Sequence, residues 1–457
     1  MDLAIRHGTL VTATATMQAD IGVSGGKIVQ IGGSVPIATM DVDATGRYVM
    51  PGAIDMHTHM DMPFMGTATS DDFETGTRAA AAGGVTTIID FAIQPEGKTL
   101  ADTVAIWDAK ARGRALVDYS FHVALTRWDD STPSQVEELI ESGLPSFKVF
   151  MAYKGALMLE DAGLLQLLQV TGRKGGLVMV HAENGDAVAT LQRQAISRGE
   201  RAPRSHAATR PRVVEGEATA RAIALAHVAD APLYVVHVSC EEAVYEIARA
   251  RRRGDRVYAE SCPQYLGAIS VEDYDRPEFE GAKFVCSPPL RGRDQADHIW
   301  HALASGVLQI VSSDHCPFTT KQKRSGVNDF TLIPNGVPGI ETLVPLVWTL
   351  GVHSGRISIN RFVQLVSTEP ARRFGLRDKG DLAIGADADL MLLDPSATGV
   401  LSAQSLHQNV DYTPYEGFEH VGRVTTTVSR GEVVWDGKTI HGRPGRGLRV
   451  HRSQHDA

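Results

Sequence analysis

Short apolar runs rich in β-branched residues recur through the middle of this sequence, and each is bounded by turn residues. We interpret eight of them as strands, namely Tyr48–His57, Val85–Phe91, Tyr119–Leu125, Ser146–Met151, Gly176–His181, Leu233–Val238, Arg256–Ser261 and Leu308–Ser313. Stretches of helical character lie between them, including Thr75–Ala82, Leu100–Ala115, Leu159–Val170, Gly216–Ala229 and Glu241–Arg253. Strands that alternate with helices indicate a parallel sheet, because parallel neighbours need a crossover, and near-continuous apolar strands indicate burial on both faces. Eight such units over about three hundred residues predict an α/β fold, a (β/α)8 TIM barrel with insertions, whose active site lies at the carboxyl ends of the strands.

Polar residues stand at the ends of several of these strands. The first strand ends in His57-Thr58-His59, and residues two apart in a strand point to the same side, so both imidazoles can face one point. The other polar residues near strand ends are Lys148, His181, His237 and Asp314. Taken singly, each has an ordinary structural explanation, such as a satisfied polar histidine, a snorkelling lysine or a capping aspartate. Together they predict a metal site at the mouth of the barrel, because imidazole is the commonest metal ligand in proteins.

Lys148 distinguishes between kinds of metal site. An ammonium would be repelled by neighbouring cations, so Lys148 either lies outside the site or is not cationic. A primary amine with a lowered pKa can react with CO2 to form a carbamate, whose two oxygens could bridge two cations roughly 3.5–4 Å apart. We therefore expect two metal ions, bridged by the Lys148 carbamate and a hydroxide. The expected ligands are His57, His59 and Asp314 for one metal, and His181 and His237 for the other.

Several blocks of sequence carry a resemblance to a known family. They are His57–Phe64, Gly83–Phe91, Ser146–Lys154, His181–Asp186, Ser287–Arg291, Ser312–Cys316, Ile333–Gly336 and Asn409–Gly417. In these blocks and in their order, over essentially its whole length, the chain resembles the cyclic amidohydrolases of the hydantoinase/dihydropyrimidinase branch, with the overall similarity leaning towards the D-selective enzymes. The resemblance implies a binuclear zinc site with a carboxylated lysine and an oxyanion donor at Tyr153. It also implies that Ser287 and Asn335 recognise the substrate ring, largely through backbone groups.

The expected reaction follows from that site. A metal-bridging hydroxide, available near neutral pH, attacks the ring amide carbon, and Asp314 takes its proton and returns it to the leaving nitrogen. A metal and Tyr153 stabilise the oxyanion. The substrates would be 5-substituted hydantoins, dihydropyrimidines or both, and the products N-carbamoyl amino acids. Met62, Phe64, Phe150 and Leu157 are the candidates to line an apolar pocket for the ring substituent, although ordinary loop packing explains them equally well.

Related activities are separated by single residues. Dihydroorotases carry an arginine two positions after the second histidine of the pair, where this chain has Asp61, which would repel a substrate carboxylate. Single-metal deaminases lack the strand-four lysine that is present here. Allantoinase activity stays an alternative, since it shares the metal site and differs mainly in the pocket. A scaffold protein similar to dihydropyrimidinase is a further alternative, marked by lost metal ligands, and no ligand position is lost in this chain.

The flanks of the chain predict a second module. A length of 457 residues exceeds what one core usually supports, and Gly25-Gly26 separates two short strands as a hairpin would. We expect residues 1–50 and 378–440 to form two parts of one small β-sandwich, residues 51–377 the catalytic barrel, and residues 441–457 a tail. The tail is expected to extend across a neighbouring subunit or to be partly disordered. Asp387 and Asp389 look like metal ligands but are interpreted as solvated turn residues.

Composition limits the partners. A net charge of −9 argues against nucleic acid or an anionic membrane as a partner. The sequence shows no signal peptide and no run of transmembrane length, and its four cysteines have no paired spacing, so we expect a cytoplasmic protein with free thiols. The expected partner is a small cyclic amide or ureide, and the resemblance implies a homo-oligomer, either a tetramer or a dimer.

Overall fold

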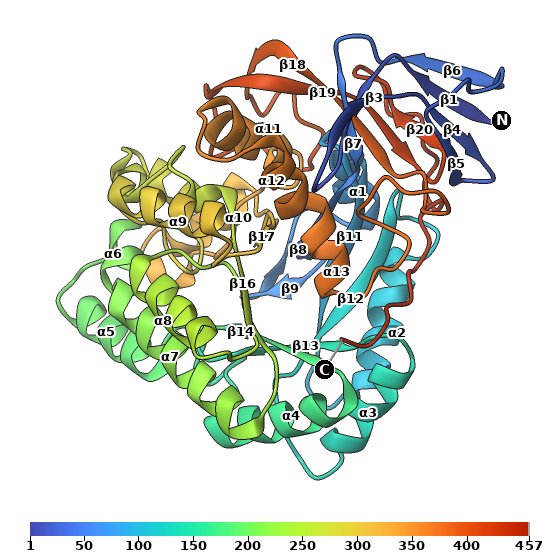
Figure 1. Cartoon of the computed structure of the whole chain (residues 1–457). Helices are drawn as coiled ribbons and strands as arrows, with labels where there is room; N and C mark the ends of the chain where they lie inside the picture. The colour runs from blue at the N-terminus through green and yellow to red at the C-terminus, as the bar shows by residue number, and fades with distance from the viewer. Residues whose placement is uncertain (456–457) are drawn as a thin grey trace.

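The computed structural model describes residues 1–455, in which eight parallel strands form the central sheet (Figure 1). In spatial order they are β8 (Ala53–Thr58), β11 (Val85–Ile93), β12 (Asp118–Ala124), β13 (Ser146–Phe150), β14 (Leu177–His181), β15 (Leu233–Val235), β16 (Val257–Ser261) and β17 (Ile310–Val311). The two edges meet through a parallel bridge between Thr58 and His315, and the His59 amide donates to the His315 carbonyl at 2.9 Å. The predicted (β/α)8 barrel is therefore confirmed.

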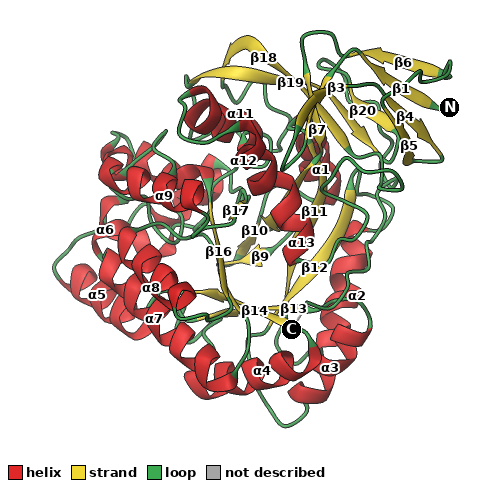
Figure 2. Cartoon of the chain, in the orientation of Figure 1, coloured by secondary structure: helices red, strands yellow, loops and turns green. Residues whose placement is uncertain are grey.

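Helices surround the barrel on its outer side (Figure 2). They are α1 (Phe73–Ala82), α2 (Leu100–Ala111), α3 (Thr132–Glu141), α4 (Asp161–Lys174), α7 (Arg212–Ala229), α8 (Glu241–Arg252) and α9 (Arg293–Ser305). Shorter helices lie in the insertions and after the last strand, namely α5 (Gly185–Ser197), α6 (Arg204–Ala208), α10 (Thr320–Lys323), α11 (Leu343–Val347), α12 (Ile359–Val363) and α13 (Glu369–Arg373). Nearly every barrel-strand residue is buried, as expected for a sheet covered by helices outside and filled by side chains inside. None of the described helices has the length and apolarity that a membrane crossing requires.

The first predicted strand, Tyr48–His57, is in fact two strands. Its first half is β7 (Tyr48–Pro51), which pairs with β2 and β18 outside the barrel, and its second half is β8. Gly52 separates them at a close approach, because a Cβ there would lie 2.3 Å from the Thr86 side chain. An apolar run cannot reveal such a change of sheet, because both halves are buried and both are extended.

Two smaller sheets are built from the N-terminal and C-terminal segments of the chain. One has the order β5-β4-β1-β6, and the other has the order β20-β19-β18-β7-β2-β3. Their strands are β1 (Leu3–Arg6), β2 (Thr9–Val11), β3 (Thr16–Gln18), β4 (Ile21–Ser24), β5 (Lys27–Ile31), β6 (Met40–Asp43), β18 (Leu390–Val400), β19 (Glu419–Ser429) and β20 (Glu432–Trp435). Residues from both ends share one apolar core, including Ile5, Val23, Leu392 and Val428. The sandwich is thus confirmed as part of the fold class, and Figure 1 shows the blue strands beside the red ones. The exact segment limits stay a prediction.

A buried lysine joins the barrel to the sandwich. Lys379 Nζ lies 2.9 Å from Asp118 of β12, 3.0 Å from Asp387 and 2.6 Å from Asp389, which precedes β18. These three carboxylates form a group that could hold a cation, and the ammonium stands among them. The interpretation of Asp387 and Asp389 as solvated turn residues is therefore wrong. The sequence pattern hid this contact because Asp118 is far away along the chain.

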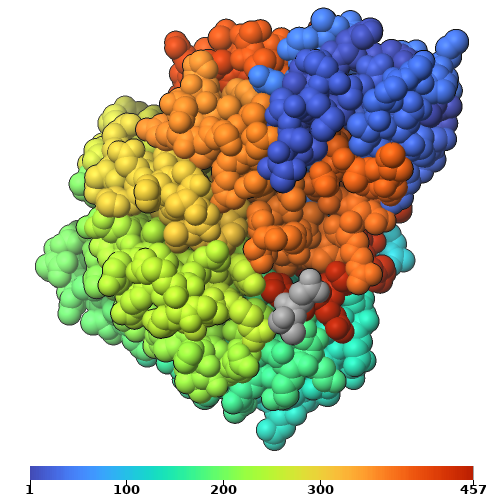
Figure 3. All heavy atoms as spheres, viewed as in Figure 1, coloured from blue at the N-terminus to red at the C-terminus, as the bar shows by residue number. Residues whose placement is uncertain are grey.

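The C-terminal tail packs on the barrel of its own chain. The Val450 amide donates to the Tyr119 carbonyl at 2.7 Å, the Arg452 guanidinium to the Phe121 carbonyl at 2.6 Å, and the His455 amide to the Gly175 carbonyl at 2.8 Å. These partners lie at or just before the barrel strands, and Figure 3 shows the red tail where orange and green parts of the surface meet. The expected extension across a neighbouring subunit and the expected partial disorder stay predictions. Residues 456–457 lie outside the described residues.

A β-hairpin and two residues with positive φ lie at the mouth of the barrel. The hairpin of β9 (Pro63–Phe64) and β10 (Thr67–Ala68) follows β8. At His237 and Asp314 the backbone takes positive φ values of 40° and 50°. The strands β15 and β17 end before these residues, so they are shorter than the apolar runs predicted. Strained backbone of this kind is concentrated at functional sites.

Candidate metal and active site

One pocket at the carboxyl ends of the barrel strands brings together all the predicted site residues. It is lined by His57, His59, Met62, Phe64, Lys148, Phe150, Tyr153, Leu157, His181, His237, Ser287, Asp314 and Asn335. Three residues outside the predicted site set, Ile93, Cys316 and Gly336, complete the lining. The predicted strands thus place their polar ends at a common mouth, as the barrel topology requires.

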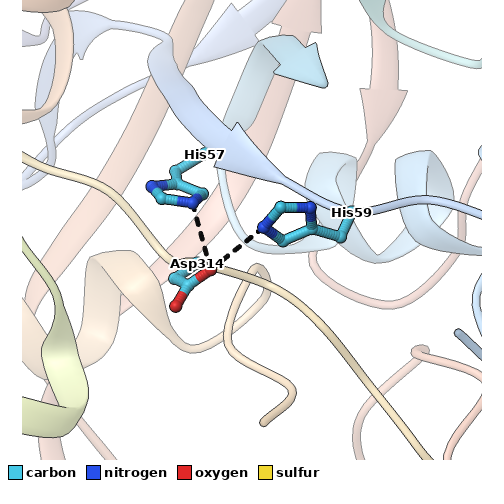
Figure 4. A group of neighbouring side chains, drawn as sticks. All are labelled: His57, His59 and Asp314. Atoms are coloured by element: carbon cyan, nitrogen blue, oxygen red, sulfur yellow. Dashed lines mark ion pairs between the residues drawn. The ribbon is translucent and has the colours of Figure 1, made fainter. Parts of the chain in front are cut away.

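His57, His59 and Asp314 form one half of the polar centre. His57 Nε2 lies 3.2 Å and His59 Nε2 lies 3.3 Å from the same oxygen, Asp314 Oδ1. Figure 4 shows both imidazoles turned from their shared strand segment towards Asp314. Ligand atoms of the three residues lie within 4.8 Å of one another, which is close enough to hold one metal ion. Burial opposes the charge of Asp314, but attraction to His57 and His59 prevails and lowers its pKa.

His181 and His237 form the other half. His181 Nδ1 lies 2.9 Å from His237 Nε2, so two ring nitrogens face each other within the pocket. The rings of His57 and His237 are 5.5 Å apart between centroids, which joins this half to the first. Burial lowers the pKa of His57, His181 and His237. These imidazoles are therefore neutral near pH 7 and keep the lone pairs that metal binding needs.

Lys148 lies on β13, lines the same pocket and is almost completely buried. Its Nζ is 5.0 Å from the centre of the Phe91 ring and 5.3 Å from that of Phe150. Burial lowers the pKa of Lys148 to about 7, so a substantial fraction of the amine is neutral at neutral pH. A neutral amine is the form that reacts with CO2. The geometry thus matches the chemistry expected of Lys148, and the carbamate itself stays a prediction.

Tyr153, Ser287 and Asn335 meet at one side of the pocket. Asn335 Nδ2 donates to Ser287 Oγ at 3.1 Å and lies 3.5 Å from the Tyr153 hydroxyl. The backbone of Tyr153, three residues after the end of β13, has a positive φ of 61°. Burial raises the pKa of Tyr153, so its hydroxyl keeps its proton and can donate a hydrogen bond. The proposed oxyanion donor and the proposed ring-recognition residues are therefore neighbours.

The apolar candidates lie beside Tyr153. The ring of Tyr153 is 5.7 Å from that of Phe64 and 5.9 Å from that of Phe150, in edge-to-face arrangements. Met62 and Leu157 also line the pocket, and their contact with a substituent stays a prediction. Asp61, in contrast, is not among the pocket-lining residues, and its carboxylate lies 3.7 Å from Lys110. Its expected repulsion of a substrate carboxylate stays a prediction.

Two buried carboxylates next to the histidines were missed by the sequence interpretation. Glu260 of β16 lies 2.5 Å from His57 Nδ1 and accepts a hydrogen bond from the Tyr234 hydroxyl at 2.9 Å. Glu183 lies 2.7 Å from His181 Nε2 and accepts from Arg210 at 2.5 Å. Each carboxylate binds the ring nitrogen that faces away from the centre, which fixes the ring's orientation and tautomer. A glutamate inside the apolar run Val257–Ser261 was the available signal for the first, and a glutamate two residues after His181 for the second.

Comparison with known proteins agrees with the fold. Residues 48–434 match the model of the amidohydrolase family. The chain is 46% identical to the D-hydantoinase of Ralstonia pickettii over 457 residues, covering 100% of both chains. It is 47% identical to the D-hydantoinase of Geobacillus stearothermophilus, covering 100% of this chain and 98% of that one. The crystal structure of dihydropyrimidinase from Brevibacillus agri NCHU1002 matches with a TM-score of 0.98 at 48% identity, over 100% of both chains.

Proposed function

The chain belongs to the amidohydrolase family, and we infer that it hydrolyses the ring amide of 5-substituted hydantoins and dihydropyrimidines to N-carbamoyl amino acids. The observation that carries this inference is the single pocket in which the six proposed ligands stand beside Tyr153, Ser287 and Asn335. Full-length relatives with the names D-hydantoinase and dihydropyrimidinase support the same substrate class.

The donor set suits two divalent cations, and zinc is the ion we propose. Four buried imidazoles and one carboxylate converge, with His57 Nε2 and His59 Nε2 facing Asp314 and with His181 Nδ1 facing His237 Nε2. We assign His57, His59 and Asp314 to one ion and His181 and His237 to the other, with the carboxylated Lys148 shared between them. Imidazole and carboxylate are ordinary zinc ligands. When bound, such a pair makes water nucleophilic near neutral pH and polarises the substrate carbonyl.

The residues of the chain then have separate tasks. Asp314, an acceptor at neutral pH, takes a proton from the attacking water and delivers it to the leaving ring nitrogen. Tyr153 keeps its proton and donates to the oxygen on which negative charge develops. Ser287 and Asn335 hold the ring in place through backbone groups.

The apolar rim decides which substituent is accepted. Met62, Phe64, Phe150 and Leu157 surround the space beside Tyr153, so alkyl and aryl groups at ring position 5 gain from burial there. Dihydrouracil would fit as the smaller substrate. We propose a preference for D-hydantoins, supported by the D-hydantoinase relatives.

A substrate panel tests the function. Zinc-loaded protein is offered dihydrouracil, D- and L-forms of 5-substituted hydantoins, allantoin and dihydroorotate, and product formation is followed by chromatography. Turnover of the first two classes with little turnover of dihydroorotate is expected, whereas allantoin as the best substrate would assign the pocket to ureide hydrolysis instead. Metal analysis should find about two ions per chain. We further propose a cytoplasmic homotetramer, for which light scattering after size exclusion gives the mass.

A further inference from the structure

Lys323 is a buried lysine outside the set of residues so far assigned to the pocket. It is the last residue of α10, a short helix that follows the segment carrying Asp314, and its side chain is only 1% exposed. Its Nζ donates to three backbone carbonyls, those of Val285 at 2.8 Å, Pro334 at 2.6 Å and Gly336 at 2.7 Å. Within residues 1–455, no carboxylate forms an ion pair with it. Burial lowers the pKa of Lys323 to about 7, so its charged and neutral forms coexist near neutral pH, and backbone oxygens are the hydrogen-bond partners of either form.

The three carbonyls belong to the two segments that carry the proposed ring-recognition residues. Val285 stands two residues before Ser287, while Pro334 and Gly336 flank Asn335 on either side. The Gly336 amide also donates to the Val285 carbonyl at 2.9 Å, so the two segments are bonded to each other as well as to Lys323. One side chain thus connects both halves of the ring-recognition wall.

Other groups also hold the backbone of these segments, but each of them contacts one segment only. His206 lies 2.8 Å from the Cys286 carbonyl, the Tyr265 hydroxyl donates to the Pro288 carbonyl at 2.6 Å, and the Cys316 amide donates to the Val337 carbonyl at 3.0 Å. Lys323 differs from these three residues because it bonds both segments.

Residues 285–290 and 333–337 lie outside regular helices and strands, so no repeating ladder of backbone hydrogen bonds fixes them. Gly336 has a φ of 146°, and a Cβ there would lie 2.3 Å from the Cys316 carbonyl, which shows how closely the segment approaches its neighbour. Where recognition depends on backbone groups, its accuracy depends on whatever holds that backbone.

Packing alone does not account for a lysine at this position. Burying an ammonium without a carboxylate is costly, and a methionine would fill similar space without that cost. Three converging carbonyls, however, need three donors, and the protonated form of a lysine supplies three from a single atom, while its neutral form still supplies two. The chemistry of the position therefore matches its task of holding two segments at one point.

We propose that Lys323 is a positioning residue for substrate recognition, and that its ammonium holds the backbone around Ser287 and Asn335 in register with the metal-binding half of the pocket. This proposal rests on the function proposed above for the identity of the ring that binds there. It predicts a selective defect. Loss of Lys323 weakens binding of every ring substrate by a similar factor, while the ranking among 5-substituents is unchanged, because the apolar rim comes from the segments around Phe64 and Phe150.

The test compares Lys323→Met with Lys321→Met, a matched loss of an exposed lysine on the same helix. We expect Lys323→Met to raise KM about tenfold or more for each substrate, with kcat within about threefold of the parent, because uniform binding is lost. Metal content should stay the same in both variants. Lys321→Met should match the parent. A lowered kcat with unchanged KM would contradict the proposal, since it indicates a smaller active fraction and only a structural role.

Hydrogen exchange provides a readout that needs no substrate. Backbone amides of residues 285–290 and 333–337 should exchange faster in Lys323→Met than in Lys321→Met, with the barrel strands unchanged, and equal exchange in these segments would overturn the proposal. If the parent protein hydrolyses none of the panel, the proposed function fails while this exchange measurement still decides the role of Lys323. Should Lys323→Met fail to fold, Lys323→Gln keeps two N–H donors and is expected to show a smaller rise of KM and intermediate exchange. A Lys323→Gln variant identical to the parent in both measurements would refute the role.

Discussion

Replacing Lys379 with methionine tests how the barrel is joined to the sandwich. In the parent, the ammonium lies within 3.0 Å of carboxylate oxygens from Asp118, Asp387 and Asp389. Burial opposes its charge, but attraction to these carboxylates prevails and raises the pKa of Lys379. Methionine has similar volume and no charge, so the variant leaves three crowded carboxylates, two of them almost fully buried, without their central cation.

The substitution is expected to lower the free energy of unfolding by a large amount for a single residue. Breaking a buried ion pair by removing one partner costs about 3–5 kcal/mol, because the remaining charge stays desolvated. Arg430 and Lys27 still contact members of the cluster, which places the expected loss near the lower end of that range. For a chain of this size, such a loss lowers Tm by roughly 3–5 °C. Activity at low temperature should persist, because Lys379 lies outside the pocket.

The difference in Tm between the parent and Lys379→Met should depend on pH, and its direction follows from the pKa of Lys379. The raised pKa of Lys379 means that its stabilisation is complete below the unfolded pKa of about 10.4 and is lost only as pH rises through the folded value. In the variant, uncompensated carboxylates take up protons more readily in the folded state. The Tm difference between parent and variant should therefore shrink as pH falls from about 8 to about 5.

Thermal scans by circular dichroism at several pH values provide the assay. Adding Ca²⁺ is a control, since three oxygens within 4.8 Å of one another could hold a cation once the ammonium is gone. Calcium should raise Tm of the variant and leave the parent unchanged. A variant as stable as the parent, or a deficit that grows at low pH, would refute the reasoning.

Three further predictions concern the pocket. Lys148→Ala should lose activity that a short carboxylic acid plus zinc partly restores, and unchanged turnover would remove Lys148 from the site. Asp314→Asn should lower kcat by about 10²–10⁴-fold with a much smaller change of KM, and a pure KM effect would reassign Asp314 to substrate positioning. Glu260→Gln should weaken zinc binding by about 10–100-fold in a chelator titration, because the carboxylate of Glu260 orients His57. Tyr234→Phe removes the other hydrogen bond of Glu260 but keeps its contact with His57, so this variant should change zinc affinity less. Equal zinc affinity in Glu260→Gln and the parent would show that Glu260 does not orient the ligand.

The local sequence pattern predicted most of the fold and most of the residues that line the pocket. The alternation of apolar runs with helical stretches determined the barrel, because a parallel sheet covered by helices leaves both signatures in the chain. Since parallel strands end at one face, the polar residues His57, Lys148, His181, His237 and Asp314 could be placed together without coordinates.

Tertiary structure alone decided the contacts that connect distant segments. Where Gly52 divides one apolar run between two sheets, both halves look alike in sequence because both are buried. The partners of Lys379, Lys323 and Glu260 could not be read from the chain, since a buried polar group is satisfied by whichever segment packs against it. Periodicity records which face of an element is buried, whereas it holds no information about which distant residue covers that face.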